Sequence, residues 1–144
     1  MSAARVIDDA AGIAALIGSV RRIAVLGIKT AQQARQPAYY VPEYLAQAGF
    51  EVIPVPVYFP EVREILGRPV LRALRDIRGT VDLVNVFRRS EQVADHLDDL
   101  LACAPRAVWM QLGIRDDAVA ARLVQAGIDV VQDRCLMVEH RRLV

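Results

Sequence analysis

A glycine, a lysine and a threonine follow the first strongly apolar run of the chain. Gly27, Lys29 and Thr30 come directly after residues 23–26, and Ile28 lies among them. In a turn from a strand into a helix, a glycine lets a ligand's phosphate approach the backbone, and the helix N-terminus adds unpaired N–H groups with partial positive charge. These residue types in this order predict an anion site, which points to a nucleotide-like ligand.

Arginines supply further candidate phosphate contacts. Arg88 and Arg89 follow a second apolar run, and Arg35 precedes the helix expected after the glycine turn. The planar guanidinium group suits bidentate contacts with phosphate. We expect at least one of Arg88 and Arg89 to bind the ligand; the alternative is that both are solvated residues before a helix. Tyr40 either borders the mouth of the site or packs in the core.

No set of residues has the spacing of a catalytic or metal site. His96 falls within an expected helix and His140 lies near the end of the chain, and neither accompanies a cluster of metal ligands or a nucleophile. We therefore expect surface histidines, no metal ion and no catalytic residues. Cys135 is the one reactive candidate, because Arg134 beside it favours the thiolate. The alternative is a small buried residue in a turn, with Arg134 paired to Asp133.

Alternating strands and helices must position these residues. Near-continuous apolar runs predict strands buried on both faces, and segments with helical patterns separate them. The expected strands are 23–28, 51–55, 81–87, 107–112 and 128–132, and a leading helix is expected at about 7–19. This order predicts an α/β, Rossmann-like three-layer fold, in which a mainly parallel five-stranded sheet carries helices on both faces. We expect one domain over residues 1–144.

Local propensities add details between the strands. Pro42 is tolerated only in the first turn of a helix, so we place it there. The proline-rich stretch 54–69 is expected to be irregular, with one turn at 62–66, and a short helix is expected at 71–77. Ser90 is a plausible N-cap of a helix with an apolar stripe, and Asp116 fits the start of another helix.

The carboxyl ends of parallel strands meet at one edge of a sheet, and ligands bind there near the switch in strand order. The G-x-G-x-x-G and P-loop motifs are both absent, which argues against a standard NAD site and against ATP or GTP hydrolysis. The second strand ends in Val55 and Pro56 instead of the acidic residue that an NAD ribose requires. This apolar rim is better suited to cover an adenine face.

Six short segments together resemble a known family. They are VLG at 25–27, QPA at 36–38, IPV at 53–55, VNVFRR at 84–89, WMQLG at 109–113 and DRCLMVE at 133–139. As an ordered set that covers roughly residue 22 to the C-terminus, they resemble the small stand-alone CoA-binding proteins of bacteria and archaea. That family resembles the CoA-binding Rossmann-like domain of succinyl-CoA synthetases and ADP-forming acyl-CoA synthetases.

The resemblance implies binding of coenzyme A (CoA) or an acyl-CoA at the carboxyl ends of the strands, without catalysis. The first turn would hold phosphates, Phe87 and the end of the second strand would flank the adenine, and the turn 111–113 would border the pantetheine path. The implied cofactor-binding residues are Gly27, Ile28, Lys29, Thr30, Arg35, Gln36, Pro37, Tyr40, Val55, Pro56, Phe87, Arg88, Arg89, Gln111, Leu112 and Gly113. A mixed disulfide between Cys135 and CoA under oxidation is a further hypothesis.

One departure from the family concerns the end of the second strand. The family commonly has Val-Asn-Pro there, whereas this chain has Val55, Pro56 and Val57. The hydrogen bonds of the asparagine are therefore lost. Phosphate contacts from Lys29 and Arg35 would offset this loss, because each charge-assisted hydrogen bond contributes about 1.5 to 3 kcal/mol.

Composition argues against several other classes. A formal net charge of +1 gives no electrostatic case for nucleic acid or an anionic membrane surface. No apolar run approaches the roughly 18 residues that span a bilayer. The two cysteines, Cys103 and Cys135, cannot form the multi-bridge framework of a small secreted domain. We expect a cytoplasmic protein whose partner is a small CoA ligand.

Two other function classes stay open. An NADP-dependent reductase could use Lys29, Arg35 and the other arginines for the 2′-phosphate. A protein-interaction or regulatory module could use the segment 54–69, with Tyr58 and Phe59 as an exposed patch. A homodimer through a sheet edge or through the leading helix is also open.

Overall fold

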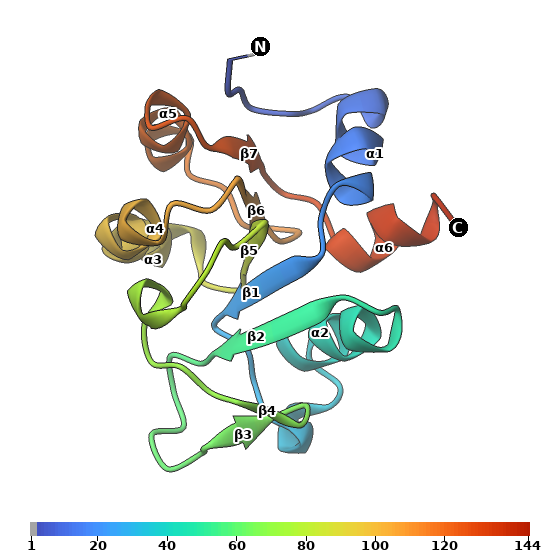
Figure 1. Ribbon diagram of the computed structural model, residues 1–144, viewed down its shortest axis with the longest axis vertical. Helices are drawn as coiled ribbons and strands as arrows, with labels where there is room; N and C mark the ends of the chain where they lie inside the picture. The colour runs from blue at the N-terminus through green and yellow to red at the C-terminus, as the bar shows by residue number, and fades with distance from the viewer. Residues whose placement is uncertain (1–2) are drawn as a thin grey trace.

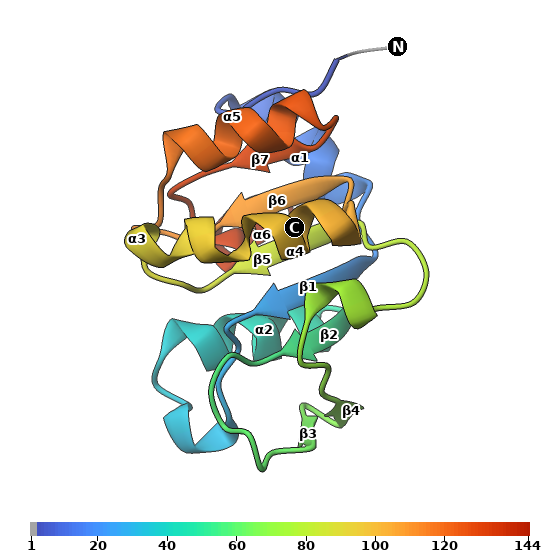
Figure 2. The same ribbon diagram turned by 90° about the vertical axis from the view of Figure 1, so that its left-hand side faces the viewer.

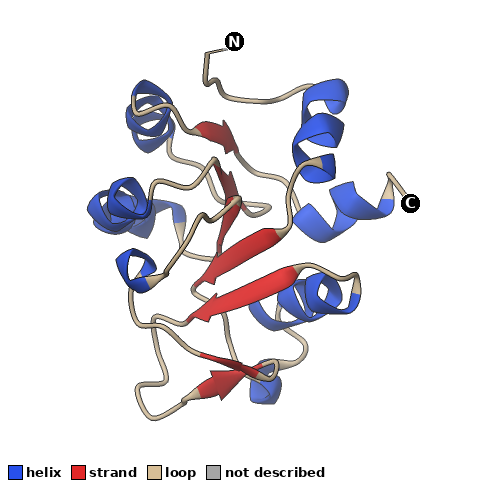
Figure 3. Cartoon of the chain, in the orientation of Figure 1, coloured by secondary structure: helices blue, strands red, loops and turns tan. Residues whose placement is uncertain are grey.

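The computed structural model describes residues 3–144, and a five-stranded sheet forms its middle layer (Figure 1, Figure 3). The strand order is β2-β1-β5-β6-β7, and every neighbouring pair is parallel. The strands are β1 (Arg22–Leu26), β2 (Glu51–Val55), β5 (Leu83–Val86), β6 (Ala107–Met110) and β7 (Asp129–Val131). All five expected strands are present, and the predicted fold class is confirmed.

Helices cover both faces of the sheet. On the right in Figure 1 lie α1 (Ala10–Gly18), α2 (Pro37–Gln47) and α6 (Leu136–Arg141). On the left lie α3 (Ser90–Val93), α4 (Leu97–Cys103) and α5 (Asp117–Gln125), with the short 3-10 helix η3 (Ala94–His96) between α3 and α4. Successive strand residues point to opposite faces, so Val25 packs with the first layer of helices and Leu26 with the second.

Strands are added first on one side of β1 and then on its other side. The chain runs from β1 to β2 on one side and then returns to place β5 on the other side of β1. In Figure 2 the arrowheads of β1 and β6 point toward the side where α3 begins, so the carboxyl ends of these strands lie there. The gap between the ends of β1 and β5 is the switch point, where open α/β sheets bind ligands.

Both outer strands are hydrogen-bonded on their outer sides. The segment before α1 runs along β7, where Ile7 N donates to Val130 O at 2.8 Å and Val130 N donates to Arg5 O at 3.1 Å. On the other edge, Leu71 N donates to Pro54 O of β2 at 3.0 Å. Covered edges resist pairing with a second chain, so the described residues offer little support for a dimer through a sheet edge.

The connection between β2 and β5 differs from the sequence prediction. Instead of an irregular stretch with one turn, residues 64–69 form a small antiparallel hairpin, β3 (Glu64–Ile65) and β4 (Arg68–Pro69). The 3-10 helix η2 (Leu74–Asp76) follows, within the stretch 71–77 where the sequence predicts a short helix. The turn residues Leu66 and Gly67 have φ values of 55° and 73°. A two-residue turn with both φ values positive matches the twist of a hairpin, but leucine is not the usual residue in it.

Pro42 lies in the second turn of α2 and not in the first, which corrects the prediction. A proline inside a helix removes one backbone donor and leaves the carbonyl four residues earlier without its helical partner. That carbonyl is Ala38 O, and it accepts the backbone N–H of Lys29 at 3.0 Å. The proline is therefore accommodated, and it fastens the turn after β1 to the first turn of α2.

Two more local predictions can be compared directly. Asp116 caps α5 as expected, since its side chain accepts the N–H of Val119 at 3.0 Å. Ser90 is not an N-cap; it is the first residue of α3, and its hydroxyl donates to Gly113 O at 3.4 Å and accepts from Arg115 N at 2.9 Å. The serine thus links the ends of β5 and β6. No helix among residues 3–144 is long and apolar enough to cross a membrane.

Candidate functional site

A cavity of about 360 Å³ lies where β1, β5 and β6 end, at the switch point of the sheet. We call it the β1–β5 cavity. It is lined by Lys29, Gln36, Pro37, Ala38, Phe87, Arg88, Arg89, Gln111, Leu112, Gly113 and Ile114. All of these except Ala38 and Ile114 belong to the set predicted from the sequence, so residues far apart in the chain meet at one edge of the sheet as expected.

The lining of this cavity carries positive charge only. Lys29, Arg88 and Arg89 contribute three cations, and no aspartate or glutamate lines the wall. A concave surface with one sign of charge concentrates the field and attracts ligands of the opposite sign. The arrangement therefore favours an anionic ligand.

Gly27 brings the turns after β1 and β5 into contact. Its φ is 86°, and a Cβ atom there would lie 2.3 Å from the carbonyl oxygen of Phe87. The N–H of Gly27 donates to Val55 O, and the N–H of Phe87 donates to Leu26 O, both at 2.9 Å. Only glycine permits this approach, because a side chain would collide with backbone and would also strain the left-handed conformation.

The first turn of α2 forms a second wall. Gln36 is the N-cap of α2, and its side-chain oxygen accepts a hydrogen bond from Lys29 Nζ. Pro37 and Ala38 follow and line the cavity. Pro37 has no N–H, and the N–H groups of Tyr39 and Tyr40 donate to Gln36 O. In the described part of the chain this leaves the N–H of Ala38 for a ligand, and the partial positive charge of the helix start adds to the attraction for anions.

Arg88 is the most firmly held cation of the lining. Its Nε donates to His96 Nε2 at 3.1 Å, and its Nη1 donates to the hydroxyl of Tyr58 at 3.3 Å. The guanidinium carbon lies 5.5 Å from the centre of the Tyr58 ring, within range of a cation–π contact. The Arg88 hydrogen bond and charge lower the pKa of Tyr58.

Both histidines are half-buried, which corrects the expectation of surface residues. His96 contacts Arg88, and burial together with the charge of Arg88 lowers the pKa of His96. His140 lies on the far side of the sheet, where its Nδ1 is 2.7 Å from the hydroxyl of Tyr44 and its ring meets Phe50 edge-on. Only His96 therefore adjoins the cavity residues.

Buried amides fix the turn after β6. Gln111 Oε1 accepts Asn85 Nδ2 at 3.3 Å and the N–H of Leu136 at 3.4 Å. Next in the turn, the N–H of Gly113 donates to Asp133 Oδ1 at 2.6 Å. The predicted pairing of Asp133 with Arg134 is wrong, since Arg134 pairs with Asp8 at 2.9 Å instead.

The sequence matches the family model described as a CoA binding domain over residues 21–141. The chain belongs to this CoA-binding family. A relative from Bacillus subtilis, the uncharacterized protein YneT, is 33% identical over 120 residues, which cover 83% of this chain and 85% of YneT. The resemblance drawn from the six sequence segments is thereby confirmed.

Solved structures agree in fold. The structure of cell-free ID.343 from Thermus thermophilus is 40% identical, with a TM-score of 0.85, and the match covers 95% of this chain and all of that one. A dinucleotide-forming acetyl-coenzyme A synthetase from Ca. Korarchaeum cryptofilum matches 76% of this chain and 25% of its own, at 17% identity and a TM-score of 0.63. That second match shows the fold alone.

The remaining residues predicted for this CoA-binding domain's site do not line the cavity. Gly27 lies beneath it, Ile28 is 1% exposed and packs in the core, and Thr30 caps the 3-10 helix η1 (Ala31–Gln33). Arg35 is exposed, and Tyr40 packs against the core. Val55, the last residue of β2, and Pro56, which follows it, are both buried.

Sequence reasoning missed four residues at or beside the cavity: Ala38, Ile114, Tyr58 and His96. Ala38 follows directly from the position of Pro37 at a helix start, which was a usable signal. Tyr58 and His96 contact Arg88 and lie 30 and 8 residues from it in the chain. No local pattern in the sequence signals contacts of that kind.

A second cavity, of about 440 Å³, lies beyond Leu112, which lines both. We call it the C-terminal cavity. Its lining is Asp8, Leu112, Arg115, Gln132, Asp133, Arg134, Cys135, Val138, Glu139 and Arg142. Cys135 is a free, half-buried thiol in this wall. Among the described residues, no group of three or more possible metal-ligating side chains comes together in either cavity.

Proposed function

We propose that this domain binds CoA or an acyl-CoA in the β1–β5 cavity and has no catalytic activity of its own. One observation carries the proposal: the chain belongs to a CoA-binding family, and a cavity whose charged lining residues are all cations lies at the switch point of its sheet. Because Cys103 and Cys135 are both free thiols, we place this binding in the reducing cytoplasm.

The geometry suggests how the ligand would lie. Phosphate groups suit the space between Lys29, Arg88 and the first turn of α2, where two cations meet the N–H of Ala38. The apolar face of Phe87 is available to the adenine. Leu112 is 66% exposed and Gly113 lies next to it, so the pantetheine chain can pass over them toward the C-terminal cavity.

The proposed lack of catalysis rests on the chemistry of the lining. The described residues of the β1–β5 cavity include no carboxylate, imidazole, hydroxyl or thiol. The C-terminal cavity, toward which the acyl end would point, holds the Cys135 thiol but no histidine in its described lining. Its three carboxylates are engaged by Arg134, Arg142 and the N–H of Gly113. Acyl transfer needs a nucleophile with an adjacent base, or a group that activates water. Incubation of acetyl-CoA with the protein is expected to release no free thiol above the rate in buffer, and thiol release proportional to protein concentration would overturn this part of the proposal.

Calorimetric titration with CoA, acetyl-CoA, NADP and ATP under reducing conditions tests the binding. We expect CoA and acetyl-CoA to bind at least about tenfold more tightly than NADP or ATP, a difference of roughly 1.4 kcal/mol. Tighter binding of NADP would favour the reductase alternative. Binding of none of the four would overturn the proposal and favour an interaction module on a nucleotide-binding scaffold.

A further inference from the structure

His96 contacts Arg88, the arginine that we assign to the ligand's phosphate. We propose that His96 is a positioning residue, whose neutral imidazole holds Arg88 in the orientation that binds an anionic ligand. The inference rests on the proposed function, because it concerns the same cavity. It goes further in two ways. It names His96, a residue outside the cavity lining, and it makes ligand binding depend on the protonation state of His96.

Three contacts fix the Arg88 guanidinium. His96 Nε2 accepts from Nε at 3.1 Å, the hydroxyl of Tyr58 accepts from Nη1 at 3.3 Å, and the centre of the Tyr58 ring lies 5.5 Å from the guanidinium carbon. Among the hydrogen bonds of residues 3–144, none uses Nη2 of Arg88. Since Arg88 lines the cavity, the donors that remain are available to a ligand.

The contact with Arg88 determines which nitrogen of the His96 imidazole is protonated. Arginine keeps its Nε proton at any ordinary pH, so the facing His96 Nε2 must be the acceptor and the ring must be neutral. A doubly protonated ring has no acceptor and would place a second cation against the guanidinium. The hydrogen bond would then be replaced by repulsion, and Arg88 would leave this orientation.

The surroundings of His96 keep the ring neutral near pH 7. Burial and the charge of Arg88 lower the pKa of His96 below its ordinary value of 6.5, while Asp95 and Asp99 act in the opposite direction. The Asp99 carboxylate is already engaged by Arg75 Nε at 2.8 Å and by the N–H of Leu74 at 2.7 Å. Protonation of His96 therefore requires a clearly acidic solution.

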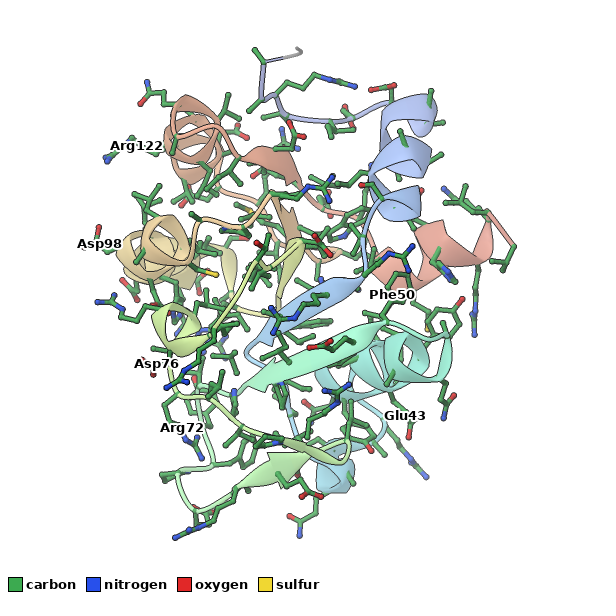
Figure 4. All side chains as sticks on the ribbon, in the orientation of Figure 1. Glu43, Phe50, Arg72, Asp76, Asp98 and Arg122 are labelled. Carbon is green, nitrogen blue, oxygen red and sulfur yellow. The ribbon has the colours of Figure 1, made fainter. Side chains whose placement is uncertain are left out.

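The other support of Arg88 is itself anchored. Tyr58 lies in the connection between β2 and β3, and Arg72, labelled in Figure 4, bonds the carbonyls of that connection. Arg72 Nη2 donates to Phe59 O at 2.9 Å and to Val62 O at 2.5 Å, and Nη1 donates to Tyr58 O at 3.3 Å. Because Arg72 holds the backbone around Tyr58, we expect Arg88 to change its orientation mainly through loss of the hydrogen bond to His96.

The test is calorimetric titration of the protein with CoA at about pH 7.5 and about pH 4.5, because the lowered pKa of His96 places its protonation below the ordinary histidine range. The ligand's own phosphates also take up protons in this range, so the comparison is between variants. His96→Gln keeps a neutral side chain that can accept from Arg88 Nε. His140→Gln is the matched control, because the other histidine lies away from the cavity against Tyr44 and Phe50.

We expect the affinity of the wild-type protein and of His140→Gln to fall roughly tenfold more on acidification than that of His96→Gln. An equal fall in all three proteins would overturn the inference. At about pH 7.5, His96→Ala should bind CoA roughly tenfold more weakly than wild type, and equal affinity would also overturn it. If His96→Ala does not fold, His96→Gln carries the test.

A double-variant cycle shows whether His96 acts through Arg88. In an Arg88→Ala background, His96→Ala is expected to have almost no further effect on CoA affinity, because the group that it positions is gone. Equal effects in both backgrounds would mean that His96 acts by another route. If wild-type protein binds no CoA at either pH, the proposed function fails; if it binds and the His96 variants behave like wild type, only this inference fails.

Discussion

The two cavities on either side of Leu112 differ in charge much more than in size. The β1–β5 cavity measures about 360 Å³ and its wall holds three cations and no acid. The C-terminal cavity is larger, about 440 Å³, and its wall also holds three cations, Arg115, Arg134 and Arg142, but three acids share that wall. There Arg134 pairs with Asp8 at 2.9 Å and Arg142 with Glu139 at 2.9 Å.

The difference teaches that volume and arginine content do not identify an anion site. An arginine already bound to a carboxylate must give up that partner before it can bind a phosphate, whereas an arginine oriented by neutral groups keeps donors available. Arg88 is oriented by an imidazole and a phenol, and both are neutral at pH 7. The smaller cavity is therefore the better candidate, and the predictions below set the two regions against each other.

The largest effect is expected beneath the β1–β5 cavity, at Gly27. Gly27→Ala would place a Cβ atom 2.3 Å from Phe87 O, at a φ of 86°. The left-handed conformation costs about 1 to 2 kcal/mol, and relief of the backbone collision would bring the total loss of unfolding free energy to roughly 3 kcal/mol or more. Chemical denaturation measures it. The C-terminal cavity tolerates a side chain at its own left-handed residue, Asp133, whose φ is 57°.

Gly127→Ala is the control for the backbone conformation. Gly127 has a φ of 85°, and a Cβ atom there would meet nothing within 4 Å. We expect this variant to lose only the roughly 1 to 2 kcal/mol of the left-handed conformation. Equal losses in the two variants would show that the contact between Gly27 and Phe87 is not needed to build the site.

The second prediction compares the loss of one arginine from each cavity, Arg88 and Arg142. Arg88→Ala should weaken CoA binding roughly tenfold to a hundredfold, because a charge-assisted hydrogen bond contributes about 1.5 to 3 kcal/mol. Arg142→Ala, in the C-terminal cavity, should change the affinity by less than about twofold, since its exposed side chain is already paired with Glu139. Titration calorimetry gives both values, and unfolding curves check that both variants fold. A larger loss for Arg142→Ala would reverse the assignment of the two cavities.

Sequence patterns predicted the scaffold of the β1–β5 cavity well because its walls follow from local rules. Apolar runs marked the five strands, and parallel strands bring their carboxyl ends together whatever the helices do. Gly27, Lys29 and the pair Arg88 and Arg89 were found from their positions directly after two of those strands. The hairpin at 64–69 was missed because a Leu66-Gly67 turn lacks the asparagine or aspartate that usually marks such turns.

The C-terminal cavity was much harder to foresee. Asp8 and Arg134 are 126 residues apart in the chain, so their ion pair has no local signature. The short helix α6, which contributes Val138 and Glu139 to the wall, spans only Leu136–Arg141 and was not predicted. Helices of this length depend on tertiary packing more than on their own propensity. The same reason explains why the support of Arg88 by Tyr58 and His96 was invisible in the sequence.

The third prediction compares Cys135 of the C-terminal cavity with Cys103 of α4, which lines neither cavity. Burial and then the nearby Asp99 raise the pKa of the Cys103 thiol to about 11, so almost none of it is thiolate at neutral pH. Cys135 lines the C-terminal cavity and is reachable from it. A small alkylating reagent at about pH 7.5 should label Cys135 at least roughly tenfold faster than Cys103, as measured by peptide mass spectrometry. Faster labelling of Cys103 would contradict this.

The same thiol tests how far the ligand extends past Leu112. If the pantetheine chain of CoA reaches the C-terminal cavity, the Cys135 thiolate can attack CoA disulfide, form a protein–CoA disulfide and release one CoA thiol. We expect intact mass to show one CoA adduct that Cys135→Ala abolishes. No adduct, or an adduct that persists in Cys135→Ala, would confine the ligand to the β1–β5 cavity.

The smallest expected effect concerns Arg35, which the sequence placed among the phosphate contacts. Its side chain is exposed and does not line the β1–β5 cavity, whereas Lys29 does and also hydrogen-bonds Gln36 at the start of α2. Lys29→Ala should weaken CoA binding roughly tenfold. Arg35→Ala should change the CoA affinity by less than about twofold. The reason is that water and salt screen the interaction of the ligand with an exposed charge outside the cavity. A loss for Arg35→Ala as large as that for Lys29→Ala would mean that the ligand extends beyond the cavity toward η1, on the side of β1 opposite Leu112.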